Sequence, residues 1–398
     1  MKILVVQETD WFERGPLQQN HLMEKLSLKG HEIRVIDHEI LWSEKEKKDL
    51  ISKREVFKDV CRLYNGSSVT VIRPPIVKFP NFDYISLIIS RKKEIERQIK
   101  EFKPDLIVGF FMLSAYLGMK AAKKHKIPFI YYWIDVYHSQ IPFKLYQPIG
   151  KIIEKDILAK SDAVISINEK LRDRIIKMGS NPRSTYIERA GIDFNRFNSN
   201  ISGRIIRKKY GFSDNDVVLT FVGVLYNFSG LKEVAIQFER IKKNYPEIKL
   251  FIVGDGDALN DLKKIQKNFN LEKKIVLAGR QPYDKIPEFI AASDICLLPA
   301  YKTEIMVDIV PIKMYEYMAM KKPVIATSLP GVVKEFGDNN GIFYVDKPED
   351  ILNKAIEIVK LKNIKEEGDK AKRFVANNEW DKIVEHFEKI SESIMGIN

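Results

Sequence analysis

A lysine and a glutamate stand among apolar residues in the segment VPIKMYEYMAMKKPVIA, residues 310–326. The pattern predicts a helix that is apolar on nearly every face, followed by a short apolar strand over residues 323–326. A charge buried in such a helix lowers stability strongly unless it is paired or binds something. Lys313 and Glu316 therefore predict either a local ion pair at i, i+3 spacing or a ligand site.

The start of this helix favours an anionic ligand. Pro311 suits the first position of a helix, because its fixed φ is helical and its missing N–H would have no partner there. The backbone N–H groups of Ile312 and Lys313 would then be free to meet a phosphate, assisted by the helix dipole and by the Lys313 ammonium group.

Short β-branched runs alternate with helical patterns along the chain, and the rhythm restarts once near the middle. This alternation predicts an α/β protein with two Rossmann-like, doubly wound parallel-sheet domains whose carboxyl strand ends face a shared cleft. The expected strands are residues 3–6, 32–36, 69–72, 106–108, 129–132 and 163–167 in the first series, and 217–222, 250–253, 275–278, 295–298, 323–326 and 342–344 in the second.

The segment AGIDFNRFNSNISGRI, residues 190–205, is rich in Asn, Gly and Ser and lacks periodicity, which indicates a hinge. We therefore expect a first domain over residues 1–195 and a second over residues 196–375. Residues 376–398 form a final helix whose apolar residues lie on one side, and we expect it to pack back on the first domain.

Composition excludes some classes of protein. The net charge of +12 invites a polyanionic partner, but the basic residues are dispersed among acidic ones and no nucleic-acid motif is present, so nucleic acid is not expected. The two cysteines, Cys61 and Cys296, lack metal-binding spacing and are expected to be reduced and structural. Without a long apolar run or a leader pattern, the expected location is cytoplasmic.

Several stretches of the sequence, taken in their order along the chain, resemble those of one protein family. The first-half stretches KGHEIRVI (29–36) and SDAVISINEKLRDRI (161–175) are followed by RAGIDFNRF (189–197), LFIVGDGD (250–257), AGRQPYDKIPEFIAASDICLLPA (278–300) and the opening segment. Together they resemble the retaining, nucleotide-sugar-dependent glycosyltransferases of the GT-B type, the glycosyl transferases group 1. The resemblance covers nearly the full length and implies an acceptor-binding first domain and a donor-binding second domain.

The family signature is a pair of acidic residues with seven residues between them. Glu316 matches the second position and by resemblance would hold the ribose hydroxyls of the donor, since a carboxylate can accept two hydrogen bonds from a diol. Asp308 matches the first position, where the family usually has Glu that contacts the transferred sugar. The alternative for Asp308 is a solvated loop acid, and the same loop also offers Glu304.

Further donor contacts are predicted at glycines and an arginine. Gly223, Gly254 and Gly256 follow two strands of the second series, where they would let the backbone approach the donor or would simply form tight turns. Arg280 follows a strand end and would reach the base or the diphosphate unless it is an ordinary surface arginine. Gly15, in the first domain, would approach the donor phosphate or would mark the turn before a helix.

The chain departs from its relatives at several positions. Many family members place an arginine and a lysine behind the glycine of the first strand of the second domain, where this chain has Val224 and Ser229. A histidine that many relatives carry near the reacting sugar is replaced by Ile134, which precedes a matching Asp135. Asp135 would contact the sugar or an acceptor hydroxyl, or would cap the following turn. The neighbouring His138 is expected to be solvated.

The sequence therefore predicts a retaining hexosyltransferase. It would move a sugar from a nucleotide-diphosphate donor to a hydroxyl of a glycan, glycolipid or lipid-linked acceptor in cell-envelope or polysaccharide synthesis, with no cofactor and no metal. An anionic membrane surface is a further expected partner, through the aromatic and apolar residues 133–152. The alternatives are a nucleotide-sugar epimerase of the same architecture and a non-catalytic GT-B-like binding protein.

Overall fold

The computed structural model describes residues 1–13, 15–39, 50–79, 82–141, 143–303 and 306–397. The chain forms two compact units, one of Met1–Arg189 with Trp380–Asn398 and one of Ala190–Glu379. The expected boundaries, 195 and 375, both fall inside the second unit. Ala190, Ile192 and Phe197 are buried in its core, and the Ile192 N–H donates to the Asn378 carbonyl at 2.6 Å.

The first unit is built on one sheet of eight strands. Its strands are β1 (Lys2–Val6), β2 (Glu32–Ile36), β3 (Glu55–Val60), β4 (Val69–Arg73), β5 (Leu106–Phe110), β6 (Phe129–Trp133), β7 (Ala163–Ser166) and β8 (Thr185–Ile187). The spatial order is β3-β4-β2-β1-β5-β6-β7-β8, and β3 pairs antiparallel with β4 whereas the other pairs are parallel. The six strands expected in this half are present, and β3 and β8 are additional.

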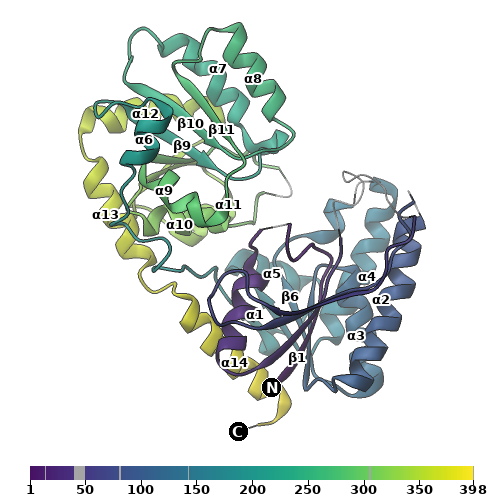
Figure 1. Ribbon diagram of the computed structural model, residues 1–398. Helices are drawn as coiled ribbons and strands as arrows, with labels where there is room; N and C mark the ends of the chain where they lie inside the picture. The colour runs from purple at the N-terminus through teal and green to yellow at the C-terminus, as the bar shows by residue number, and fades with distance from the viewer. Residues whose placement is uncertain (14, 40–49, 80–81, 142, 304–305, 398) are drawn as a thin grey trace. The chain divides into compact units, whose positions relative to one another are not determined.

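Helices cover this sheet, as Figure 1 shows. They are α1 (Gln18–Leu28), α2 (Phe82–Glu101), α3 (Leu113–His125), α4 (Gln147–Lys160), α5 (Glu169–Lys177) and α14 (Trp380–Met395). Helix α2 contacts α3, and α3 contacts α4, whereas α14 packs against α1. The apolar side of α14 enters the core of the first unit, where Trp380 stacks on His21 with ring centroids 4.8 Å apart.

The second unit has a fully parallel sheet of six strands. They are β9 (Val217–Val222), β10 (Ile248–Val253), β11 (Ile275–Gly279), β12 (Ile295–Leu298), β13 (Val324–Thr327) and β14 (Ile342–Val345). The order β11-β10-β9-β12-β13-β14 is that of a Rossmann-like fold, in which the chain first builds outward from β9 on one side and then on the other. All strands expected in this half are present.

The helices of the second unit separate two apolar cores from solvent. They are α6 (Arg204–Tyr210), α7 (Leu231–Ile241), α8 (Leu259–Asn268), α9 (Ile286–Ala291), α10 (Ile312–Ala319), α11 (Pro330–Phe336), α12 (Ile351–Leu361) and α13 (Ile364–Val375). Helix α10 buries Met314, Tyr315, Tyr317 and Met318 in one core, as the apolar pattern of the opening segment predicts.

Candidate functional site

The second sheet reverses its direction of growth between β9 and β12. At such a point the loops after the two strands diverge, and ligands of open α/β sheets bind in the resulting crevice at the carboxyl ends. Gly223 follows β9 directly, and the chain after β12 leads to α10, which carries Lys313 and Glu316. The topology therefore places these three residues at one switch point.

The glycine turns of this edge pack on one another. The Gly223 N–H donates to the Val253 carbonyl, and the Gly254 N–H donates to the Gly279 carbonyl, each at 2.9 Å. A Cβ on Gly254 would overlap the Gly223 carbonyl oxygen, and one on Gly256 would lie 2.8 Å from the Leu225 nitrogen. Loop packing alone thus explains why positions 254 and 256 are glycine. Contact of Gly254 and Gly256 with a donor stays a prediction.

Helix α10 begins at Ile312, one residue later than predicted, and Pro311 is the extended residue before it rather than the first helical residue. The N–H groups of Ile312 and Lys313 lie in the first turn, where no helical carbonyl is available to accept from them. The helix is fastened to the end of β9, because the Tyr317 hydroxyl oxygen accepts a hydrogen bond from the Val222 N–H at 2.8 Å. The first turn of α10 is therefore held beside Gly223.

Lys313 points across the switch point. Its Nζ lies 4.0 Å from the centroid of the Phe221 ring, and a Cβ on Gly223 would overlap this nitrogen. Burial lowers the pKa of Lys313 to about 8, and the nearby Glu316 carboxylate opposes that shift. Within the described residues Lys313 forms no ion pair at contact distance with Glu316, so the local pair considered as an alternative is not formed there.

Glu316 accepts one hydrogen bond, from the Tyr283 hydroxyl to Oε1 at 3.0 Å. Burial raises the pKa of Glu316 to about 7, against the opposing effects of the Tyr283 hydrogen bond and of the Lys313 and Arg196 charges. The Arg196 guanidinium lies over the Tyr283 ring, 5.0 Å from its centroid. Sequence reasoning missed Tyr283 and Arg196 as site residues, although both lie inside the stretches that carried the family resemblance.

Asp308 and Arg280, two further predicted donor residues, lie on loops of the second unit. Asp308 lies on the loop before α10, where a Cβ on Gly331 at the start of α11 would be 2.7 Å from the Asp308 carbonyl group. Arg280 is exposed and directly follows β11. This strand lies at one edge of the sheet, and β10 and β9 separate it from β12. Glu304 lies outside the described residues.

Val224 and Ser229 stand where many relatives have cations, and the structure describes both residues. Val224 is exposed, and Ser229 is buried with its hydroxyl donating to the Tyr226 carbonyl at 2.6 Å. Lys232, a conceivable replacement, has its Nζ 3.4 Å from an Asp261 carboxylate oxygen. Lys313 is therefore the best-placed cation for a diphosphate at this switch point among the described residues.

In the first unit, Asp135 is the second residue after β6, at the carboxyl edge of the sheet. Its Oδ1 accepts from the Val136 N–H at 2.7 Å, and Oδ2 accepts from the Gln140 side chain. Burial raises the pKa of Asp135 to about 6. The expectation that His138 is solvated was wrong: it is buried, and its ring contacts the carboxylate of Glu154, a residue of α4.

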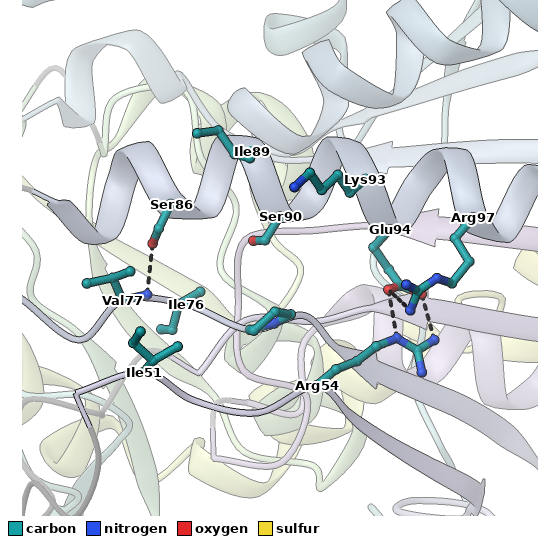
Figure 2. Close-up of a pocket in the computed structure, with 11 residues that line it drawn as sticks. Ile51, Arg54, Ile76, Val77, Ser86, Ile89, Ser90, Lys93, Glu94 and Arg97 are labelled. Atoms are coloured by element: carbon teal, nitrogen blue, oxygen red, sulfur yellow. Dashed lines mark hydrogen bonds and ion pairs between the residues drawn. The ribbon is translucent and has the colours of Figure 1, made fainter.

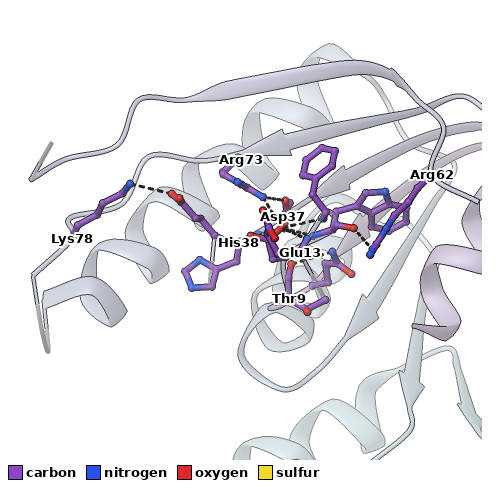
Figure 3. Close-up of polar contacts among 12 residues, drawn as sticks. Thr9, Glu13, Asp37, His38, Arg62, Arg73 and Lys78 are labelled. Atoms are coloured by element: carbon purple, nitrogen blue, oxygen red, sulfur yellow. Dashed lines mark hydrogen bonds and ion pairs between the residues drawn. The ribbon is translucent and has the colours of Figure 1, made fainter. Parts of the chain in front are cut away.

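A buried polar cluster holds the loop between β1 and α1, which carries Gly15 (Figure 3). Arg73 bridges the carboxylates of Asp10 and Asp37 at 3.0 and 2.6 Å. Arg62 donates to the Gly15 carbonyl at 3.3 Å, and Gly15 has a φ of +76°, a conformation that favours glycine. A contact between Gly15 and a donor phosphate stays a prediction.

A pocket of about 420 Å³ lies elsewhere in the first unit, beside α2, and none of the predicted site residues lines it (Figure 2). Its walls combine apolar residues, among them Ile51, Ile76 and Ile89 of α2, with polar and charged ones. At one end Arg54 binds the Glu94 carboxylate through two hydrogen bonds of 2.8 Å. The Glu94 carboxylate in this pocket is already paired with both Arg54 and Arg97.

Comparison with known families accounts for both units. The model of the Glycosyl transferases group 1 matches residues 203–381, and that of Glycosyltransferase Family 4 matches residues 20–196. Both units thus match glycosyltransferase families, and the second unit matches the glycosyl transferases group 1. Both matched families are glycosyltransferases, and the chain has the two Rossmann-like domains of the GT-B fold.

Individual relatives are distant. An uncharacterized glycosyltransferase of Methanocaldococcus jannaschii is 26% identical over 299 residues, which is 74% of this chain and 70% of that protein. The UDP-Gal:alpha-D-GlcNAc-diphosphoundecaprenol alpha-1,3-galactosyltransferase of Escherichia coli is 26% identical over 56% of this chain and 50% of its own length. Several of the curated relatives are thus matched over only about half of their length.

Solved structures share the fold. HepE of Anabaena in complex with UDP aligns with a TM-score of 0.75 at 15% identity, over 99% of this chain and 100% of that one. Sucrose-phosphate synthase of Thermosynechococcus elongatus aligns with a TM-score of 0.77 at 15% identity, over the full length of both. Within the described residues there is no cluster of three or more His, Cys, Asp or Glu suited to a metal ion, and no helix is long and apolar enough to cross a membrane.

Proposed function

We propose that this glycosyltransferase takes a nucleotide-diphosphate sugar as donor, binds it through the second unit at the β9–β12 switch point, and transfers the sugar with retention to a hydroxyl of an acceptor bound by the first unit. The observation that carries the proposal is the presence of a cation and a carboxylate on the first turns of α10, with Lys313 against Gly223 and Glu316 hydrogen-bonded by Tyr283.

In the proposed reaction each residue has one task. The bond between the anomeric carbon and the donor phosphate oxygen breaks, the bond to the acceptor oxygen forms, and the acceptor proton passes to the leaving diphosphate. Lys313 and the first N–H groups of α10 stabilise the charge that develops on the diphosphate. Glu316 accepts hydrogen bonds from the ribose diol. Asp308 contacts the transferred sugar, and Asp135 contacts the acceptor hydroxyl.

This arrangement needs no metal, because a helix N-terminus and an ammonium group together offset the diphosphate charge. It also offers a substitute for the cations missing at Val224 and Ser229. We expect full transfer activity after EDTA treatment and dialysis. Loss of activity that added Mg²⁺ or Mn²⁺ restores would refute metal independence.

The test of the donor site is a calorimetric panel of UDP-, GDP-, ADP- and dTDP-sugars against the wild type and Glu316→Ala. We expect one nucleotide to bind, and the variant to lose about tenfold in affinity, which corresponds to about 1.4 kcal/mol. The matched control is Glu357→Ala, which removes a carboxylate that is 56% exposed on α12 and paired with Lys354. Absence of binding by every nucleotide sugar would overturn the proposed donor.

Two other functions remain distinguishable by their products. An epimerase of the same architecture would release free nucleotide and an altered sugar without any acceptor. A non-catalytic binding protein, which the exposed Val224 and the buried Ser229 favour, would bind the donor without turnover. Product analysis of a donor incubation with and without lipid extract separates the three.

For the acceptor, we propose a lipid-linked or membrane-bound glycan that the protein reaches by binding an anionic membrane. The carrying feature is the segment from Phe143 through the first turns of α4, where Phe143, Leu145 and Ile152 are 70%, 82% and 68% exposed. Lys144, Lys151 and Lys155 are exposed in the same segment. Apolar side chains mixed with lysines suit the interface of an anionic bilayer.

The position of this segment supports the same proposal. It follows β6, so it starts at the carboxyl edge of the first sheet, where Asp135 lies. On helix α2, Ile85, Ile88 and Ile89 are also exposed, and Ile89 lines the pocket of Figure 2. Two relatives, the E. coli galactosyltransferase and the alpha-monoglucosyldiacylglycerol synthase of Streptococcus pneumoniae, bear lipid products or substrates in their names.

Vesicle sedimentation tests the membrane proposal. We expect binding to phosphatidylglycerol vesicles at low salt, weaker binding to phosphatidylcholine vesicles, and a loss of at least tenfold in the double variant Leu145→Ser, Ile152→Ser. Leu361→Ser, on α12 of the second unit with a side chain 60% exposed, is the control and should leave binding unchanged. Equal binding by all three proteins, or no binding by the wild type, would favour an acceptor free in solution.

A further inference from the structure

Glu316 is hydrogen-bonded to Tyr283, and the Tyr283 ring in turn contacts the Arg196 guanidinium group. Tyr283 lies in a short 3-10 turn before α9, and its hydroxyl donates to Glu316 Oε1 at 3.0 Å. The Arg196 guanidinium carbon is 5.0 Å from the centroid of the Tyr283 ring, and the Phe197 ring meets the same ring edge-on at 5.9 Å. Two residues that are adjacent in sequence therefore hold one tyrosine.

The segment that carries Arg196 is itself fixed. The Asp193 carboxylate accepts hydrogen bonds from the N–H groups of Asn195 and Arg196, both at 3.1 Å. The same carboxylate lies 3.6 Å from the Arg196 Nε. This Asx-type turn sets the direction of Arg196, and the attraction between a cation and an aromatic face then sets the Tyr283 ring.

The chemistry of a diol explains why such support would be useful. A carboxylate that accepts from two ribose hydroxyls must present its lone pairs in one plane, and a side chain with free rotation about its terminal bond does so only part of the time. A hydrogen bond to Oε1 fixes that plane. A nearby guanidinium also favours the ionised carboxylate over the protonated one.

We propose that Tyr283 and Arg196 are positioning residues for donor binding: Tyr283 orients the Glu316 carboxylate toward the donor ribose, and Arg196 holds the Tyr283 ring in place. This inference rests on the proposed function. The charged or titratable groups that act on Glu316 within the described residues are Tyr283, Lys313 on the same helix, and Arg196.

The test uses the full chain and the nucleotide sugar that binds the wild type in the calorimetric panel, titrated from pH 5.5 to 8.5. Tyr283→Phe should weaken binding about tenfold at pH 7 and move the acidic midpoint of binding upward, because the lost hydrogen bond stabilised the ionised carboxylate. Arg196→Gln should shift the midpoint in the same direction, and Arg196→Lys should restore part of the loss since it keeps a cation over the ring.

Matched controls separate positioning from general damage. Tyr344→Phe removes a hydroxyl that donates to the Gly337 carbonyl at 3.0 Å, and Arg240→Gln removes an arginine bonded to Gln237 on α7. Both should keep the affinity and the acidic midpoint of the wild type. A second readout needs no ligand: the carboxyl ¹³C shift of Glu316 in glutamate-labelled protein, assigned with Glu316→Gln, should titrate at higher pH in Tyr283→Phe.

The outcomes distinguish this inference from the function on which it rests. If the wild type binds a nucleotide sugar while Tyr283→Phe and Arg196→Gln keep its affinity and its Glu316 titration, the positioning role is overturned and the donor site stands. If the wild type binds no nucleotide sugar, the proposed donor site is overturned. The proposal that Glu316 is positioned for a ribose then fails with it.

Discussion

Burial acts on Lys313 and Glu316 in opposite directions. It lowers the pKa of the ammonium to about 8 and raises the pKa of the carboxyl to about 7. Both groups are therefore charged together only within a narrow range of pH. Such shifts are typical of residues that meet a ligand, since a site that served stability alone would gain little from two unpaired charges in a poorly solvated position.

This convergence predicts a bell-shaped pH dependence of donor binding. Glu316 must be ionised to accept from a diol, so affinity rises as pH increases through about 7, and Lys313 must be protonated to bind a phosphate, so affinity falls as pH increases through about 8. Calorimetry at constant ionic strength should show the maximum between these values. Glu316→Gln should lose the acidic limb and Lys313→Met the alkaline limb; the limbs belong to the coupled pair, so each variant should also shift the remaining one.

A glycine substitution tests the contact that places Lys313. Gly223→Ala would put a Cβ where Lys313 Nζ lies, at a φ of +141° that alanine rarely adopts. We expect a loss of stability of about 1–3 kcal/mol and, separately, at least a tenfold loss of donor affinity because Lys313 is displaced. Gly211→Ala is the control: its φ is +74° and a Cβ there meets nothing within 4 Å. Equal donor affinity in the two variants, measured with urea unfolding in parallel, would contradict the proposed role of Lys313.

At the scale of elements, sequence periodicity predicted the buried strands and missed strands that are exposed or very short. The strands that are buried throughout, such as β5 and β6, are continuous apolar runs and were predicted. Strand β3 is largely exposed, carries charged residues and pairs antiparallel at an edge, so its pattern resembles a loop. Strand β8 has only three residues. Tyr283 and Arg196 were missed because side-chain contacts between distant segments leave no spacing pattern in a single sequence.

Helix α14 lets the contribution of one element be measured. Phe387 is fully buried between α14 and the core of the first unit. Phe387→Ala should lower the free energy of unfolding of that unit by about 3–5 kcal/mol, through lost burial and the cavity left behind. Urea unfolding followed by circular dichroism would measure this. Ile397→Ala, whose side chain is 57% exposed beyond the helix, should change stability by less than about 0.5 kcal/mol, and a small effect at Phe387 would contradict the packing of α14 on the first unit.

At the scale of the whole molecule, the two units differ in how the chain forms them. The first unit is discontinuous in sequence, because α14 completes it from the far end of the chain, whereas the second is the continuous segment Ala190–Glu379. The two ends of that segment meet, since Ile192 pairs with Glu379 in a parallel bridge. A continuous unit with adjoining ends and its own cores is the kind of segment that folds alone.

This connectivity predicts that residues 190–379 form an autonomous donor-binding domain. The described partners of Glu316 and Lys313, which are Tyr283, Arg196 and Phe221, all lie inside it, so the fragment should bind the same nucleotide sugar as the full chain, within about tenfold of its affinity, and should lose that binding with Glu316→Ala. It should show no transfer, because the proposed acceptor residue Asp135 is absent. A folded fragment, shown by a cooperative thermal transition, that bound no donor would mean that the first unit supplies an essential part of the nucleotide site.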